Sequence, residues 1–113
     1  MSALLIIDVQ NDFITGSLKV RGAEEIITGI NKLKKDKLFN LVVLSQDSHP
    51  QDHISFASNN NTDILKEIDL KYNNIKYKQI MWPNHCIKDS YGESFHPLME
   101  IDDNDIIIKK GEN

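Results

Sequence analysis

Three short apolar runs constrain this chain most, because each is too short for a helix and each leads into an ionisable residue. They are Ala3–Val9, which contains Asp8, then Leu41–Leu44, which is followed by Ser45-Gln46-Asp47, and Asp105–Lys109, which is followed by Lys110. Continuous apolar runs of this length are typical of strands in a parallel sheet that is buried on both faces. They predict three parallel strands that deliver Asp8, Asp47 and Lys110 to one edge, where open α/β sheets bind ligands.

The segments between these runs complete an α/β pattern. Residues 23–36 place Ile26, Ile27, Ile30 and Leu33 on one face, with acidic residues at the start and lysines at the end, as the helix dipole prefers. Strand, helix and strand in this order predict a βαβ unit. Residues 49–91 are loop-rich, with a short helix predicted near residues 62–71. So long a connection in a compact domain is usually functional.

Composition excludes several classes of partner. The net charge is −4, and of the 13 basic residues only Arg21 is arginine, the side chain best suited to phosphate and guanine recognition. A nucleic-acid or anionic-membrane partner is therefore not expected. The first apolar run is too short for a signal peptide or a membrane span, and a single cysteine excludes an internal disulfide. We therefore expect one domain in the cytoplasm.

A stiff loop at Gln79–Cys86, with the sequence QIMWPNHC, places Trp82, His85 and the only cysteine close together. Pro83 cannot extend a helix, so this segment is predicted to be a rigid loop. An indole, an imidazole and a thiol held on such a loop are typical of one wall of a pocket.

Asp47 and His49 are two residues apart at the end of a predicted strand, so both side chains should point to the same side. With His85 they form an Asp/His/His set suited to zinc, iron or manganese, with water in the remaining positions. His53 is a fourth candidate ligand, although we favour the alternative of a hydrogen bond within its own loop. His96 is expected to be structural.

Asp8 and Lys110 are expected to form a pair of opposite charges at the same edge of the sheet. Such a pair is most often a plain ion pair. It supports catalysis when a nucleophilic thiol lies between the two groups, because a thiolate needs a cationic neighbour and a nearby base. Cys86 is the only thiol in the chain. It directly follows His85, with no helix start or second base nearby, so we predict a buried packing role for it.

Four segments of the chain resemble the nicotinamidases, within the isochorismatase-like cysteine hydrolases. In the order of that family they are LLIIDVQNDFITGSLKVRGAEEII, LVVLSQDSHPQDHISFAS, QIMWPNHCIKDSYGESFHPLM and IIIKKG. The WPNHC and D-x-H-P-x-x-H-x-S-F-A motifs are the most specific. The resemblance implies a three-layer α/β fold with a mainly parallel sheet and flanking helices, of which residues 1–113 would be the N-terminal part.

The same resemblance implies an amide hydrolase that converts nicotinamide and water to nicotinate and ammonia, a step in NAD salvage. The matching positions are Asp8 and Lys110 for catalysis, Asp47, His49 and His85 for a metal, and Phe13, Leu18 and Trp82 for contacts with the pyridine ring. Zinc is the metal expected first, with iron or manganese as alternatives. Nicotinamide is the implied partner, and a homo-oligomer is left open.

The expected nucleophile is the main departure from the family's pattern. The resemblance places it after the Lys110-Gly111 motif, at the start of a helix, whereas Cys86 matches a different cysteine of the family. Ser48 stands where relatives usually carry tryptophan, a change expected to affect loop packing more than chemistry. Three hypotheses follow, in order of preference: a fragment of a hydrolase, a complete but non-catalytic metal or nicotinamide binder, and a chain whose nucleophile is Cys86.

Overall fold

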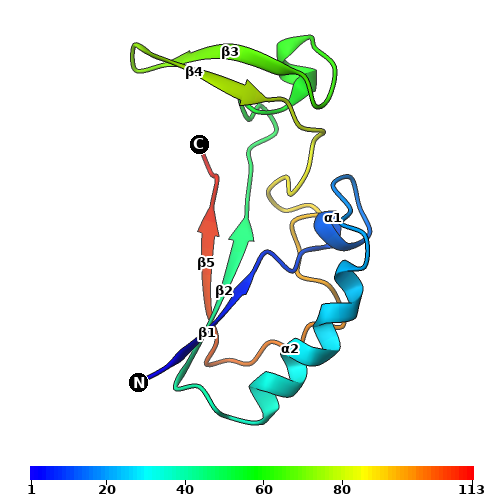
Figure 1. Ribbon diagram of the computed structural model, residues 1–113, viewed down its shortest axis with the longest axis vertical. Coiled ribbons are helices and arrows are strands. Elements are labelled where there is room, and N and C mark those ends of the chain that lie inside the picture. Colours follow the sequence, from blue (N-terminus) through cyan, green and yellow to red (C-terminus); the bar gives the residue numbers. More distant parts are fainter.

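A computed structural model describes residues 1–113, and its central feature is a parallel sheet of three strands (Figure 1). The strands are β1 (Ala3–Ile7), β2 (Leu41–Asp47) and β5 (Ile106–Lys110), in the spatial order β1-β2-β5. The three predicted strands are therefore confirmed. β2 continues past the apolar run to Asp47, because its parallel pairing with β5 extends to the register pair of Asp47 and Lys110.

Helix α2 (Ile26–Lys35) covers one face of the sheet, which confirms the predicted helix. Its predicted first residues form a 3₁₀ turn instead, η1 (Ala23–Glu25), with no side-chain cap at the start of either element. A short helix, α1 (Asn11–Ile14), follows β1. The core lies between α2 and the sheet and consists of Ile6, Val9, Ile14, Ile27, Leu44 and Met99.

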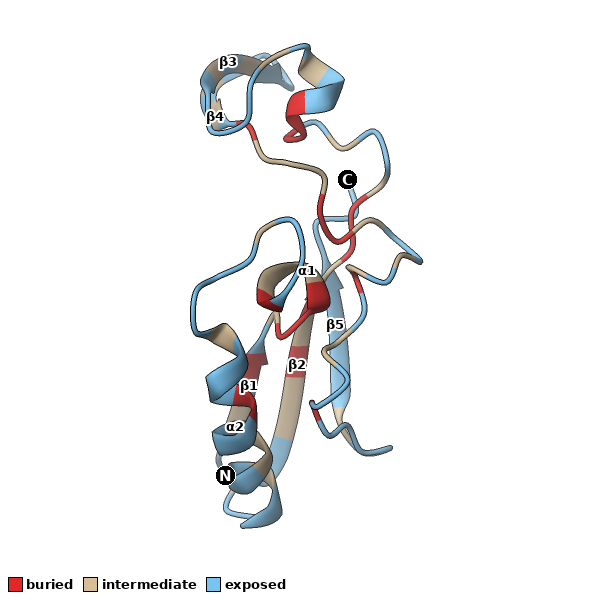
Figure 2. Cartoon of the chain, turned by 90° about the vertical axis from the view of Figure 1, so that its right-hand side faces the viewer, coloured by how far each residue is buried: buried red, intermediate tan, exposed pale blue.

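The opposite face of the sheet carries no helix, and its apolar side chains are exposed. On β1, Ile6 is 3% exposed, whereas the next residue, Ile7, is 63% exposed. Ile108 of β5 lies on the same side as Ile7 by register and is 54% exposed, and β5 is exposed along most of its length (Figure 2). The predicted burial therefore holds on one face only, and there only for β1 and β2, because Ile107 of β5 lies on the same face as Ile6 and Leu44 and is 45% exposed. The radius of gyration is 16.1 Å, above the value of about 13 Å typical of a compact domain of this length.

A β-hairpin occupies the region where a helix was predicted near residues 62–71, so that prediction was wrong. Strands β3 (Glu67–Tyr72) and β4 (Ile75–Ile80) pair antiparallel and are joined by Asn73 and Asn74. The two asparagines have φ angles of 47° and 63°, the left-handed conformation that a tight two-residue hairpin turn requires. In Figure 1 the hairpin lies at the top, beyond the carboxyl ends of the parallel strands.

Two isolated β-bridges connect the loop after β2 with the loop after β4. One joins His49 to Ile87, and the other joins Phe56, just before the 3₁₀ turn η2 (Ala57–Asn60), to Trp82. These bridges hold the WPNHC segment close to the carboxyl end of β2. The longest helix, α2, has 10 residues, and no helix has the length and apolarity needed to cross a bilayer.

Candidate metal and catalytic site

The carboxyl ends of the three parallel strands bring Asp8, Asp47 and Lys110 together. Asp8 directly follows β1, while Asp47 and Lys110 end their own strands. Lys110 Nζ lies 2.9 Å from an Asp8 carboxylate oxygen and also forms an ion pair with Asp47. The Asp8 and Asp47 side chains are 21% and 14% exposed, so this charged trio is partly withdrawn from water. Their catalytic and ligand roles stay predictions.

Asp8 is held in an uncommon backbone conformation. Its φ angle is 53°, in the left-handed region that few residues other than glycine adopt. The Ser45 hydroxyl donates a hydrogen bond of 2.6 Å to the Asp8 carboxylate, and the Asp8 N–H donates to the Ser45 carbonyl oxygen at 3.3 Å. Backbone strain that neighbouring contacts maintain in this way is concentrated at functional sites.

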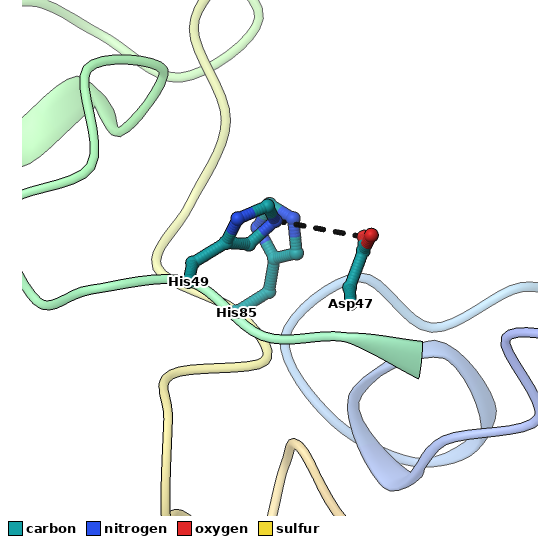
Figure 3. Close-up of side chains that lie close together, drawn as sticks. All are labelled: Asp47, His49 and His85. Atoms are coloured by element: carbon teal, nitrogen blue, oxygen red, sulfur yellow. Dashed lines mark ion pairs between the residues drawn. The ribbon is translucent and has the colours of Figure 1, made fainter. Parts of the chain in front are cut away.

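Asp47, His49 and His85 form a cluster suited to a metal ion (Figure 3). Each residue offers one ligand atom, and these atoms all lie within 4.8 Å of one another. The two imidazole rings come from different loops, and their centroids are 4.9 Å apart with the ring planes at 82°. The structure thus places side by side the three residues expected to bind a metal.

The second ring nitrogen of each histidine supports this role. His49 Nδ1 is 2.6 Å from the Gly111 carbonyl oxygen, and His85 Nδ1 is 2.7 Å from the Pro83 carbonyl oxygen. Because a carbonyl oxygen only accepts, each Nδ1 carries the hydrogen, and Nε2 of the neutral ring keeps a free lone pair. Metal-binding histidines usually have this arrangement. Gly111 has a φ angle of 70°, and a Cβ there would lie 2.4 Å from the His49 ring, so a side chain would displace the carbonyl group.

Burial and charge set the protonation of the cluster. Burial alone would raise the pKa of Asp47, but hydrogen bonds from His49 and Lys110 prevail and hold this pKa at about 2. Burial lowers the pKa of His85, which favours the neutral imidazole that binds metals. Burial also acts to lower the pKa of His49, but its hydrogen bond with Asp47 outweighs this and raises it. A metal would therefore compete with a proton at His49.

The other two histidines make local hydrogen bonds, which was predicted for His53. His53 Nδ1 is 2.8 Å from the Ser55 hydroxyl, and His53 is not part of the Asp47/His49/His85 cluster. His96 Nδ1 accepts a hydrogen bond of 3.2 Å from the Leu98 N–H.

Cys86 has the environment of a packing residue. Its side chain is fully buried, and its thiol faces the Gly92 carbonyl oxygen at 3.8 Å. Burial, reinforced by the nearby Asp12 carboxylate, raises the pKa of the Cys86 thiol well above its ordinary value. The burial agrees with the packing role predicted for Cys86, and the raised pKa disfavours the thiolate that nucleophilic attack requires.

The residues expected to contact a pyridine ring are not gathered around one cavity. Phe13 lies beside the cluster, with its ring centroid 5.7 Å from that of His85. A cavity of about 270 Å³ is lined by Phe13, Asp8 and six apolar residues, but not by Trp82 or Leu18, which are half-buried elsewhere. The ring contacts of Phe13, Leu18 and Trp82 stay predictions.

Two polar residues near the site, Gln10 and Asp12, received no role from the sequence. The fully buried Gln10 amide donates to the Asp47 carbonyl oxygen and accepts from the Asp47 N–H, both at 2.8 Å. Asp12 accepts a hydrogen bond of 2.7 Å from the Cys86 N–H. Both residues lie in the IIDVQNDF stretch, whose unusual content of polar residues directly after a buried strand was the available signal.

Fold and site together define the class of this protein. It is an α/β protein whose Asp/His/His cluster lies at the carboxyl edge of a parallel sheet, where such folds bind ligands. The family model described as "Isochorismatase domain" matches residues 2–112. The chain therefore belongs to the isochorismatase family.

Within this family the chain is similar to nicotinamidases. The nicotinamidase of Acinetobacter baylyi is 40% identical over 111 residues, which cover 96% of this chain and 49% of that protein. A solved structure of an Acinetobacter baumanii nicotinamidase is 42% identical, with a TM-score of 0.87 over 99% of this chain and 52% of that chain. The chain spans about half the length of the curated relatives that it matches.

Two further solved structures contain bound ligands. A yeast nicotinamidase bound to the inhibitor nicotinaldehyde is 29% identical, with a TM-score of 0.86 over 99% of this chain and 57% of that chain. A Pyrococcus horikoshii pyrazinamidase in complex with zinc is 28% identical, with a TM-score of 0.72 over 98% of this chain and 52% of that chain.

Proposed function

We propose that this chain forms the metal-binding and acid–base part of a nicotinamidase-type amide hydrolase, which converts nicotinamide and water to nicotinate and ammonia in NAD salvage. The observation that carries this proposal is the meeting of the Asp8–Lys110 ion pair with the Asp47/His49/His85 cluster. Asp47 belongs to both groups, because it pairs with Lys110 and lies 3.5 Å from His49. The similarity to nicotinamidases supports the choice of substrate.

Asp47, His49 and His85 would hold a divalent metal ion, with zinc favoured over iron or manganese. Two neutral imidazoles and one carboxylate suit zinc and leave positions for water or substrate. The zinc complex of the Pyrococcus relative supports this choice. Bound there, the metal would supply a Lewis-acidic site for the pyridine nitrogen. Phe13 and Trp82 would supply aromatic walls for the flat ring.

Asp8 and Lys110 suit the proton transfers of amide hydrolysis. Asp8 accepts the proton of an attacking thiol, and Lys110 stabilises the resulting thiolate, which bonds to the carboxamide carbon. Asp8 then gives the proton to the nitrogen as the C–N bond breaks, so ammonia leaves and a thioester is formed. Water hydrolyses the thioester to nicotinate and the free thiol.

The attacking thiol of this scheme is not Cys86, which is buried and protonated. We place the nucleophilic cysteine outside the 113-residue sequence, with residues 1–113 as the N-terminal part of one nicotinamidase-like domain.

The same buried thiol favours a second candidate function, in which the chain binds a metal or nicotinamide without catalysis. Reading the transcript past the codon for Asn113 separates the two. An in-frame segment with a cysteine at a helix start supports the hydrolase, and a stop codon without a partner chain supports the binder.

The metal part of the proposal is tested on the purified chain by zinc titration and elemental analysis. We expect one zinc per chain, lost in Asp47→Ala and His85→Ala. His96→Ala is the matched control, since His96 makes only a local hydrogen bond, and this variant should keep the metal. A wild-type chain that folds but binds no zinc, iron or manganese would contradict the proposal.

The catalytic part is tested by ammonia release from nicotinamide, with substrate binding followed by NMR titration of the zinc-loaded chain. We expect the chain alone to bind nicotinamide and to release no ammonia. Release of ammonia that disappears in Cys86→Ser would overturn the placement of the nucleophile outside this sequence.

A further inference from the structure

We propose that Asp12 positions both histidines of the Asp47/His49/His85 cluster, a role that rests on the metal site proposed above. A single residue, Cys86, links Asp12 to the two rings. The Cys86 N–H donates a hydrogen bond of 2.7 Å to Asp12 Oδ2, and the Cys86 carbonyl oxygen accepts one of 2.9 Å from the His49 N–H. Cys86 also directly follows His85 in the chain. The Asp12 carboxylate therefore acts on both imidazoles through the backbone.

The backbone at Cys86 needs such support. Its φ angle is 47°, in the left-handed region that residues other than glycine rarely adopt. A hydrogen bond from a backbone N–H to a carboxylate is roughly twice as strong as a bond between neutral groups, so it can hold this conformation. Without it, the N–H of a fully buried residue would lose its acceptor.

Two glycines form a slot for the Asp12 carboxylate, which is an independent sign that its position matters. A Cβ at Gly92 would lie 1.9 Å from Asp12 Oδ2, and a Cβ at Gly16 would lie 2.2 Å from Asp12 Oδ1. Neither glycine has a positive φ angle, so backbone conformation does not account for them. The close approach of both backbones to the carboxylate explains the two glycines, because it leaves no room for a Cβ.

A local role accounts for only one carboxylate oxygen of Asp12, because the Ser17 N–H donates a hydrogen bond of 3.4 Å to Oδ1 and not to Oδ2. Asp12 lies in the first turn of α1, but that helix has 4 residues, and its N-cap makes no side-chain hydrogen bond. The bond from Asp12 to Cys86 spans 74 residues of sequence. Asp12 therefore joins the segment after β1 to the loop that carries His85.

The first test measures zinc affinity by competition with a chromophoric chelator, together with the visible absorption of the cobalt-substituted chain. Asp12→Ala should weaken zinc binding by about 10–100-fold, the range found when a group that orients a metal ligand is removed. Asp12→Asn keeps an oxygen for the Cys86 N–H and should restore most of the affinity. Asp52→Ala, which removes an exposed charge close to His53, is the control and should have no effect.

The glycine slot gives a second, sharper test. The three atoms nearest to a Cβ at Gly92 all belong to the Asp12 carboxylate, so Gly92→Ala should weaken zinc binding in the wild type but add little in Asp12→Ala. A Cβ at Gly16 would also lie 2.6 Å from the Asp12 Cα, so Gly16→Ala should stay harmful in both backgrounds. If the effects of Gly92→Ala and Asp12→Ala on zinc affinity were additive, the glycine slot for the Asp12 carboxylate would be refuted.

Amide hydrogen exchange of the metal-free chain separates this inference from the proposed function. Asp12→Ala should lose protection at the Cys86 and His49 amides, and Asp52→Ala should not. If the wild type binds no metal but Asp12→Ala loses this protection, the metal site fails and the positioning role stands. If the wild type binds zinc and Asp12→Ala keeps both its affinity and its protected amides, the positioning role is refuted.

Discussion

Replacing Ile6 and Ile7 of β1 by alanine, one at a time, tests whether only one face of the sheet is packed. The substitution removes three carbons, about 2.4 kcal/mol of transfer free energy at about 0.8 kcal/mol per methylene. Ile6 is 3% exposed and belongs to the core, so a cavity term adds to this, and the free energy of unfolding should fall by about 3–4 kcal/mol. Ile7 is 63% exposed, so only roughly 40% of the transfer free energy applies to it, and Ile7→Ala should lower the free energy of unfolding by about 1 kcal/mol.

Adjacent positions on one strand share the same loss of β-propensity, so the difference between the two variants reports burial. Urea unfolding followed by circular dichroism, with a common slope, measures this difference. If Ile6→Ala does not fold, Ile6→Val at about 1 kcal/mol and Ile7→Val at about 0.3 kcal/mol make the same comparison. Equal losses at the two positions would refute one-sided packing. If the loss of unfolding free energy in Ile7→Ala also grew with protein concentration, a second copy of the chain would be covering the face of the sheet that carries Ile7.

Three further predictions concern other parts of the structure. Gln10→Ala removes both hydrogen bonds to the Asp47 backbone and should lower the free energy of unfolding by about 2–3 kcal/mol in urea, whereas the exposed Gln51→Ala should change it by less than about 0.5 kcal/mol. Asn74→Ala replaces asparagine, which tolerates the left-handed region, by a residue that tolerates it less well at a φ angle of 63°, and should cost about 1 kcal/mol, whereas Asn74→Gly should raise the melting temperature. Burial acts to raise the pKa of Glu93, but the hydrogen bond from Lys109 prevails and lowers it. The stability from Glu93 is therefore complete above its ordinary pKa of 4.5 and is lost as the pH falls through the lower folded pKa. Glu93→Gln should flatten the loss of melting temperature below pH 5, and the exposed Asp103→Asn should not.

The parallel strands could be predicted because their signal is local. An apolar run of strand length carries the prediction by itself, and its end marks the edge of the sheet. The exposure of Ile7 could not be predicted, because burial of a strand's second face depends on whether another element covers it. The β3–β4 hairpin was missed although its signal was present. Asn73-Asn74 lies between two segments in which apolar residues alternate with polar ones, a pattern of period two that excludes an amphipathic helix.

The candidate site could be predicted in part for the same reason. Asp8, Asp47 and Lys110 follow from the strand ends, and the structure brings them into contact. No local rule brings His85 to His49. The sequence analysis grouped the two residues because their side chains suit a metal ion, and the resemblance to a family implied the same grouping. Asp12 escaped notice because its partner lies 74 residues away, so its spacing in the sequence says nothing about the contact.

The site and the core of this chain depend on different interactions. Hydrogen bonds between side chains and backbone hold the cluster: Gln10 to Asp47, Asp12 to Cys86, and His49 to Gly111. None of these contacts involves the exposed apolar side chains of the sheet. Zinc affinity and stability should therefore separate, because Ile7→Ala weakens the fold without moving a ligand, whereas Asp12→Ala moves ligands without opening the core. A change in zinc affinity in Ile7→Ala would show instead that packing of the sheet, and not the backbone contacts of the loops, sets the geometry of the cluster.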